Sequence, residues 1–286
     1  MWVVFAFLSL LFLNARTIVT KFNVSKTHEY ISIWYTFLFQ IPLGVVAVLI
    51  MGIRIDDPQF FILVFGRVWL DIVAFIFFFK SLKLSSISIV LPFLALQPAL
   101  SVFTSYFING QAIEPLRLIL VLIIAAACYI LYKATSEKSS KGLDNKKGII
   151  FMLIVVGLYA ILDPLHAEIL EISAPTTYFF ISSLYFITIW SIFIFWNFRK
   201  ELFKSFKDRK AVLFNGSNGV ILSLEVLSLF SALVPGSITA VVSSIRSTNI
   251  AVSSILGGII FKEKLNKRKL LLIGIITMAV ILLVAI

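Results

Sequence analysis

Charged side chains and cysteines are scarce in this sequence, and each scarcity excludes a class of protein. Only 14% of the residues are charged, whereas 60% are hydrophobic and the mean hydropathy is +1.05. A water-soluble domain of this size does not need so much apolar sequence. The single cysteine, Cys128, lies in an apolar run, cannot form an internal disulfide, and is expected to be a small buried residue.

Catalytic and metal-binding patterns are also missing. The sequence has no Walker loop, no HExxH and no G-x-S-x-G elbow, and its two histidines, His28 and His166, belong to no metal-ligand cluster. We therefore expect no enzyme, no metal and no cofactor. The net charge of +11 is concentrated in short segments between apolar runs, so it indicates membrane orientation and not a nucleic-acid partner.

Long apolar runs are what the sequence has in abundance. Stretches of about 17–25 residues recur along the chain, and each can cross about 30 Å of hydrocarbon as a helix. The first run has no basic residues ahead of it, so we interpret it as a mature span and not as a signal peptide. We predict an all-α polytopic membrane protein with ten transmembrane helices, over residues 2–21, 30–52, 60–81, 86–108, 115–133, 148–170, 174–198, 211–232, 236–261 and 268–286.

The chain repeats itself at half its length. Residues 79–111 and 230–262, offset by 151 positions, each hold a small-residue turn followed by an apolar helix with polar interruptions. Five helices per half is an odd number, so two sequential copies enter the membrane in opposite directions, as in inverted-repeat transporters. We predict a first five-helix repeat over 1–133, a cytoplasmic polar linker over 134–147 and a second five-helix repeat over 148–286.

Basic residues are divided unequally between two sets of loops. The loops after the first, third, fifth, seventh and ninth predicted helices hold 20 of the 25 lysines and arginines, whereas the other loops hold only Arg54 and Arg117. The positive-inside rule therefore predicts a multi-pass protein of the cell membrane with the basic loops in the cytoplasm and both termini outside.

Few charges lie at bilayer depth, where each costs about 2.5–3.5 kcal/mol on insertion scales unless it is paired or hydrated. Arg67 and Asp71 share a helix face, so they are either a self-neutralising pair or a substrate contact with a proton-linked carboxylate. Glu225 and Arg246 each lie ten residues from the turn at Pro235–Gly236, which makes a cross-helix ion pair plausible. That pair is either a structural staple or part of a site for an anionic or zwitterionic group.

Polar neighbours favour the site over the staple. Arg246 lies in the run SSIRSTN, which also ends in Asn249. Arg16 follows Asn14 in the first helix, and it either joins this site or snorkels to the cytoplasmic end. Asp163 precedes a proline that kinks its helix and frees a backbone carbonyl, whereas the three acidic or basic residues after it, His166, Glu168 and Glu171, are expected at the membrane interface.

The internal repeat adds one further candidate. The offset aligns Gln97 and Pro98 with Thr248 and Asn249, so the two helices either kink for packing or face each other across a cavity. The run from Asn215 to Gly219 is expected to pack helices closely, with cavity lining as the alternative.

The candidate substrate-binding residues are Arg246, Asn249, Gln97, Asn14, Arg16 and Arg67, and the candidates for proton coupling are Asp71, Glu225 and Asp163.

Several segments together resemble a known family. They are FKSLKLSSISIVLPFLALQPALS, FSALVPGSITAVVSSIRSTNIAVS, the end-of-helix turn with Glu263 in FKEKLNKRKLLLIGIITMAVILL, and Ala174-Pro175-Thr176. The pattern resembles the EamA branch of the drug/metabolite transporter superfamily. The resemblance implies ten helices in two inverted repeats, a central cavity and secondary transport of small metabolites. Family members usually have both termini in the cytoplasm, so the charge bias of this chain departs from the family.

These observations favour a secondary transporter, an exporter or a proton-coupled carrier, of small polar metabolites such as amino acids or related organic anions. The two repeats would rock around a midplane site within the lipid bilayer, in a monomer or a homodimer. Two alternatives stay open. The many phenylalanines and basic loops also suit a flippase or transporter of a phosphorylated lipid carrier, and the chain could instead be a non-transporting membrane partner subunit.

Overall fold

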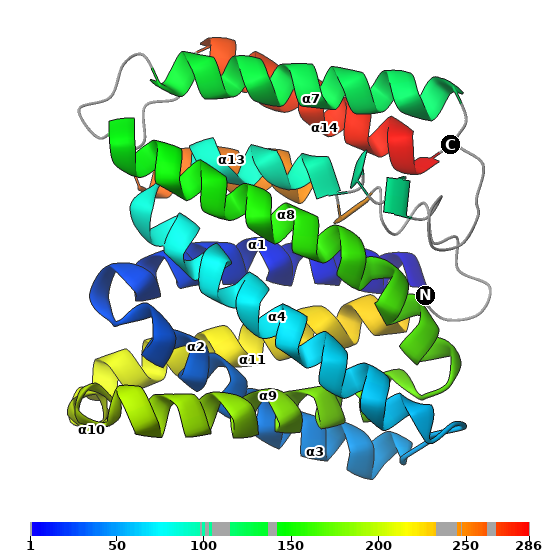
Figure 1. Cartoon of the computed structure of the whole chain (residues 1–286), viewed down its shortest axis with the longest axis vertical. Coiled ribbons are helices and arrows are strands. Elements are labelled where there is room, and N and C mark those ends of the chain that lie inside the picture. Colours follow the sequence, from blue (N-terminus) through cyan, green and yellow to red (C-terminus); the bar gives the residue numbers. More distant parts are fainter. Residues whose placement is uncertain are drawn as a thin grey trace.

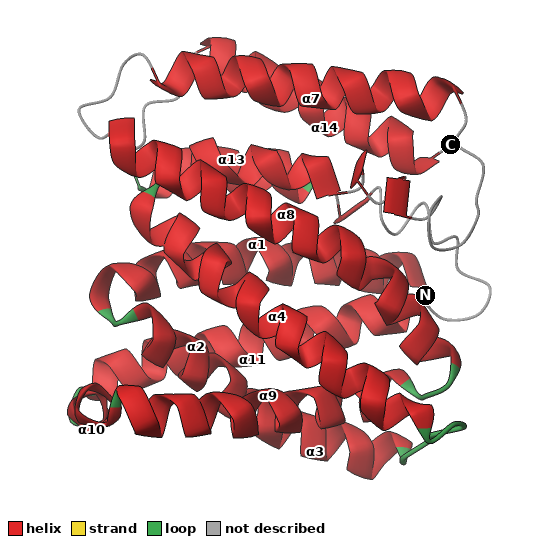
Figure 2. Ribbon diagram, in the orientation of Figure 1, coloured by secondary structure: helices red, strands yellow, loops and turns green. Residues whose placement is uncertain are grey.

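Nearly all of the described chain is helical (Figure 2). The structure is a computed structural model that describes residues 2–97, 99–100, 103–104, 115–136, 142–232, 245–246, 248–261 and 267–285. A helix satisfies every backbone N–H and C=O internally, which is what a long apolar segment requires in hydrocarbon. By length and composition, six helices among these residues can cross a membrane: Trp2–Val24, Glu29–Met51, Gln59–Leu84, Asp144–Leu162, Pro175–Asn197 and Arg209–Leu229.

Proline divides two of the predicted helices of the first half. The helix predicted over 30–52 is broken at Phe39, because Pro42 has no N–H to donate to the carbonyl four residues earlier. The helix predicted over 86–108 begins as α-helix and tightens to a 3₁₀-helix at Pro92, whereas Pro98 lies outside the described residues. The helices are α1 (Trp2–Lys26), α2 (Glu29–Leu38), α3 (Gln40–Met51), α4 (Gln59–Leu84), α5 (Ile87–Val90), η1 (Leu91–Ala95) and α7 (Pro115–Ser136).

The second half holds one helix that the sequence pattern does not predict. The short α10 lies in the basic segment between the seventh and eighth predicted helices. α7 and α8 both extend into the linker predicted over 134–147, and the predicted turn at Pro235–Gly236 and Glu263 lie outside the described residues. The helices are α8 (Gly142–Glu171), α9 (Pro175–Asn197), α10 (Arg199–Phe206), α11 (Arg209–Ala232), α13 (Asn249–Ile260) and α14 (Lys267–Ala285).

Helices of the two halves interleave. Figure 1 shows α7 beside α14 at one end of the molecule and α3 beside α9 at the other, with α1, α4, α8 and α11 between them. α1 packs along α11, and α4 packs along α8, so each of these pairs joins one helix from each half. The centre of the molecule is therefore built by both halves together.

Loop contacts define two sides of the bundle. We call one side the basic side, and it holds Lys21 and the end of α4. There the ammonium group of Lys21 donates to the carbonyls of Leu82 and Ser85. Ser81 Oγ also donates to the Gly148 carbonyl near the start of α8, at 2.7 Å. On the opposite side, the α3–α4 loop pairs with the α8–α9 loop, where the Ala174 N–H donates to the Arg54 carbonyl at 3.0 Å.

The outer surface is strongly apolar. Trp196 is 86% exposed, Leu49 is 78% exposed and Ile62 is 76% exposed, whereas the large rings of Trp190 and Phe186 are buried. Such a large exposed apolar area is not compatible with water and is expected where helices contact lipid. The interior holds a large apolar core together with a smaller set of buried polar and charged side chains, and some of these form the candidate site.

Candidate functional site

Two arginines converge on one glutamate in the centre of the bundle. Glu225 projects from α11, Arg16 from α1, and Arg246 from the short described helical segment before α13. Arg246 Nη2 donates to Glu225 Oε1 at 2.6 Å, so the cross-helix ion pair expected from the sequence is present. Arg16 Nε lies 3.0 Å from Glu225 Oε2, so Arg16 joins this pair and does not snorkel to the helix end.

This Arg–Glu–Arg triad carries an excess of positive charge. The Glu225 side chain is 4% exposed, Arg16 is 14% exposed and Arg246 is 26% exposed. Burying a charge away from water is costly unless a partner of opposite sign compensates it. Among the described residues, Glu225 is the only carboxylate in contact with either guanidinium group, so the triad itself has two positive charges and one negative charge.

Amide and hydroxyl groups on α1 and α13 form a hydrogen-bonded cluster, and its two asparagines lie two and three residues from the triad arginines in the sequence. Ser253 Oγ on α13 lies 2.7 Å from Asn14 Oδ1 on α1 and 2.6 Å from Asn249 Oδ1. A hydroxyl group has a single proton, so Ser253 donates to one of the two amide oxygens at a time. The other oxygen is a hydrogen-bond acceptor at the site. The sequence pattern points to both asparagines but not to Ser253, which lies one helical turn after Asn249.

A second charged cluster joins α4, α8 and α9. Arg67 Nη1 lies 2.8 Å from Asp71 Oδ2, which is the predicted pair on one helix face. Arg67 Nη2 lies 2.6 Å from His166 Nε2, and the guanidinium carbon lies 5.2 Å from the centre of the Tyr178 ring. His166, which the sequence places at the membrane interface, contacts both Arg67 and Tyr178 through its ring.

Tyr159 on α8 is near both clusters. Its hydroxyl is within electrostatic reach of both, namely of Arg16, Arg67, Asp71 and Glu225. His166 is likewise within reach of Arg67 and Arg246. The clusters therefore form one polar centre. Tyr159, Asp163 and His166 are spaced four and three residues apart on α8, so helical spacing from Asp163 could have identified Tyr159 and grouped it with His166.

The remaining candidates are less completely described. Gln97 follows η1 and is partly buried. Asp163 lies within α8, and its side chain is outside the described part of the structure. In the parts of the chain that the structure describes, no three His, Cys, Asp or Glu side chains come together as a possible metal site.

A buried polar seam holds α11 against α1 and α2. Thr20 Oγ1 and Thr36 Oγ1 each lie 3.1 Å from the side-chain amide of Asn218. A Cβ atom at Gly219 would lie 2.3 Å from the Thr36 carbonyl oxygen, so the backbones of α11 and α2 approach closely there. The run from Asn215 to Gly219 therefore packs helices, as the sequence pattern favours.

Solved structures match this fold, and for one of them the match extends over almost the whole chain. Among them, 25 chains match, including one crystal structure with a TM-score of 0.66 and 12% sequence identity. The match covers 99% of this chain and 96% of the other. At this low identity the likeness concerns the fold alone. None of the curated proteins matches this sequence.

The second half of the sequence matches a known protein family. Residues 146–285 match the EamA-like transporter family, and this segment holds Glu225, Arg246, Asn249 and Ser253. The match agrees with the apolar helices and with the resemblance of the sequence motifs. Residues 146–285 belong to the EamA-like transporter family of the drug/metabolite transporter superfamily, and the chain is a multi-pass membrane protein of the transporter type.

Proposed function

We propose that this chain is a secondary transporter of small polar metabolites that carry a carboxylate, such as amino acids or related organic anions. The observation that carries the proposal is the Arg–Glu–Arg triad, with two partly buried arginines and one buried glutamate. A substrate anion would supply the negative charge that the triad lacks. A guanidinium group suits this role because its N–H groups bind a carboxylate in a bidentate fashion.

Arg246 is the proposed anchor for the substrate carboxylate. It is the more exposed of the two triad arginines, and Glu225 already binds one of its terminal nitrogens. The amide oxygen that Ser253 leaves without its proton would accept a hydrogen bond from an amino or hydroxyl group of the same substrate. Together these groups fit a small molecule with an acidic end and a donor at the other end.

Glu225 and Asp71 are the proposed groups for proton coupling, with Asp163 as a third candidate. A substrate carboxylate at Arg246 competes directly with Glu225, which then keeps only Arg16 as a partner. Asp71 is joined to the same polar centre through Arg67 and the neighbourhood of Tyr159. Substrate binding therefore changes the charge balance around a buried carboxylate, which is the requirement for coupling to a proton.

The proposed architecture is ten helices in two inverted five-helix repeats that rock around this centre. Two observations support it. α1 ends on the basic side whereas α8 begins there, so the first helices of the two halves run in opposite directions. The central pairs α1–α11 and α4–α8 each combine one helix from each half, so relative motion of the halves would open the centre. We propose that the basic side faces the cytoplasm.

A ligand screen by thermal unfolding tests the proposed substrate class. Purified protein in detergent is melted with equal concentrations of amino acids, dicarboxylates, carboxylate-free amines and neutral polyols. A ligand at 100 times its Kd stabilises the folded state by about 2.7 kcal/mol, so carboxylate-bearing ligands should raise Tm. Arg246→Gln should remove the shift, whereas Arg54→Gln, a half-exposed arginine paired with Asp56, should keep it.

Two outcomes would contradict the proposal. Stabilisation by amines and not by carboxylates would exclude an anion-binding centre. Stabilisation by long-chain lipid phosphates alone would favour the flippase alternative.

A further inference from the structure

The unpredicted helix α10 is amphipathic and lies at the basic side of the bundle. Leu202 is completely buried, and Ser205 Oγ lies 3.0 Å from the Tyr35 hydroxyl. The Phe206 ring packs against the Trp34 ring, with centroids 5.9 Å apart. Phe198, just before α10, packs against His28 in the α1–α2 connection, with centroids 4.9 Å apart. One face of α10 is therefore fixed to α2 at the membrane end of the bundle.

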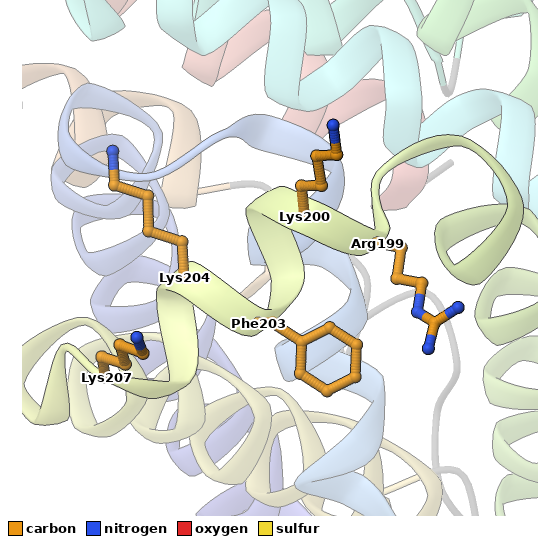
Figure 3. A pocket seen from close by; sticks show the side chains of 5 residues that line it. All are labelled: Arg199, Lys200, Phe203, Lys204 and Lys207. Carbon is orange, nitrogen blue, oxygen red and sulfur yellow. The ribbon is translucent and has the colours of Figure 1, made fainter.

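The opposite face of α10 bears an open pocket lined by basic side chains. The pocket has a volume of about 560 Å³ and is lined by Arg199, Lys200, Phe203, Lys204 and Lys207 (Figure 3). Figure 3 shows Lys200 and Lys204 extending from one edge of the helix and Arg199 and Phe203 from the other. At 100° per residue these five positions cover an arc of about 140°, which excludes Glu201. The pocket therefore concentrates positive charge.

These cations lack acidic partners within the protein. All four are exposed, and among the described residues no carboxylate forms an ion pair with them. Within the described parts of the chain, the group makes one cation–π contact, which joins Arg199 to Phe203 with 5.7 Å between the guanidinium carbon and the ring centre. Four like charges so close together repel one another, and a bound anion relieves that repulsion.

The surroundings of the pocket indicate an anion that belongs to a lipid. The last turn of α9, directly before α10, exposes Phe195 by 48% and Trp196 by 86%. Tryptophan at the end of a membrane helix lies at headgroup level, and Phe203 adds an apolar ring inside the pocket itself. The phosphate group of a phospholipid would contact the cations, while the acyl chains of the same lipid would lie along the exposed apolar end of α9. A free anion would not use the apolar part of this surface.

We propose that α10 and the end of α9 form a binding site for the headgroup of an anionic phospholipid at the basic side of the membrane. This site is separate from the proposed substrate centre and does not depend on it. It combines a fixed amphipathic helix, four cations along one face of that helix and an adjoining lipid-exposed aromatic surface. A basic residue near an anionic membrane surface contributes about 1 kcal/mol, which corresponds to about a fivefold change in affinity.

The test measures binding of phosphatidylglycerol to the full-length protein in detergent by native mass spectrometry, with phosphatidylcholine as the neutral comparison. The pocket variant carries Arg199→Gln, Lys200→Gln, Lys204→Gln and Lys207→Gln. The control variant removes the same charge elsewhere, with Lys146→Gln, Lys147→Gln, Lys267→Gln and Arg268→Gln. We expect the pocket variant to bind phosphatidylglycerol at least about tenfold more weakly than wild type. The control variant should stay within about twofold of wild type, and binding of phosphatidylcholine should not change.

Three results would overturn the proposal. Equal losses in the two variants would show a general effect of net charge, and equal binding of both lipids would exclude headgroup recognition. Competition by inorganic phosphate at concentrations comparable to the lipid would identify the pocket as a free-anion site. If the fourfold variant has a lowered Tm, Lys204→Gln alone keeps the test decisive, because a single exposed lysine should still weaken binding about fivefold.

Discussion

Glu225 is the residue on which the polar centre depends, because its carboxylate is shared by arginines from two other segments. Part of this arrangement follows from the sequence. Equal distances from a predicted turn place Glu225 and Arg246 at the same depth, and spacing by four pairs Arg67 with Asp71. The role of Arg16 does not follow, because it requires knowing that α1 packs along α11, a contact between residues more than 200 positions apart.

Neutralising Glu225 is expected to destabilise the protein strongly. Glu225→Gln leaves Arg16 and Arg246 adjacent in a buried site with no carboxylate between them. Breaking a buried ion pair by removing one partner costs about 3–5 kcal/mol, so Tm in detergent should fall clearly. Glu201→Gln on the exposed side of α10 is the matched control and should leave Tm unchanged. Equal Tm values for the two variants would show that Glu225 does not stabilise the centre.

At the scale of elements, sequence patterns predict the long helices, but they do not predict the break within one of them or the short helix α10. Apolar runs predict α1, α4, α9 and α14 because hydrocarbon demands continuous helix. The break at Phe39 is caused by Pro42, but an apolar run does not show whether such a proline bends the helix or interrupts it. α10 is too short and too polar for an apolar pattern to predict it. It is stable as a helix because Leu202 and Phe206 make tertiary contacts with the rest of the protein.

Close approach of α11 and α2 makes a glycine necessary at position 219. Gly219→Ala would place a Cβ atom 2.3 Å from the Thr36 carbonyl oxygen, and backbone cannot move aside as a flexible side chain can. Overpacking of this kind costs about 1–3 kcal/mol, so the free energy of unfolding should fall. Gly274→Ala on α14 meets no atom within 4 Å and should be neutral or raise stability by up to about 1 kcal/mol. A stable Gly219→Ala protein would show that the two helices are less tightly packed than the structure indicates.

At the scale of the whole molecule, the interleaving of the halves explains why the candidate site is asymmetric. The repeat aligns Arg246 with Ala95, so the first half has no arginine at the equivalent position. Arg16 from the first half instead reaches Glu225 of the second half. Sequence comparison between the halves predicts matching helices, but it cannot predict that charges from different positions of each half converge. That convergence gives the Arg–Glu–Arg triad two arginines for one carboxylate.

The central claim is that Arg246 binds a substrate carboxylate during transport, and uptake into proteoliposomes tests it most directly. A carboxylate-bearing ligand from the thermal screen is supplied in radiolabelled form to wild type, Arg246→Gln, Arg246→Lys and Arg54→Gln. A lost charge-assisted hydrogen bond costs about 1.5–3 kcal/mol, so Arg246→Gln should transport at least about tenfold more slowly. Arg246→Lys should retain part of the activity, and Arg54→Gln should match wild type. Uptake by a folded Arg246→Gln protein at the wild-type rate would contradict the account.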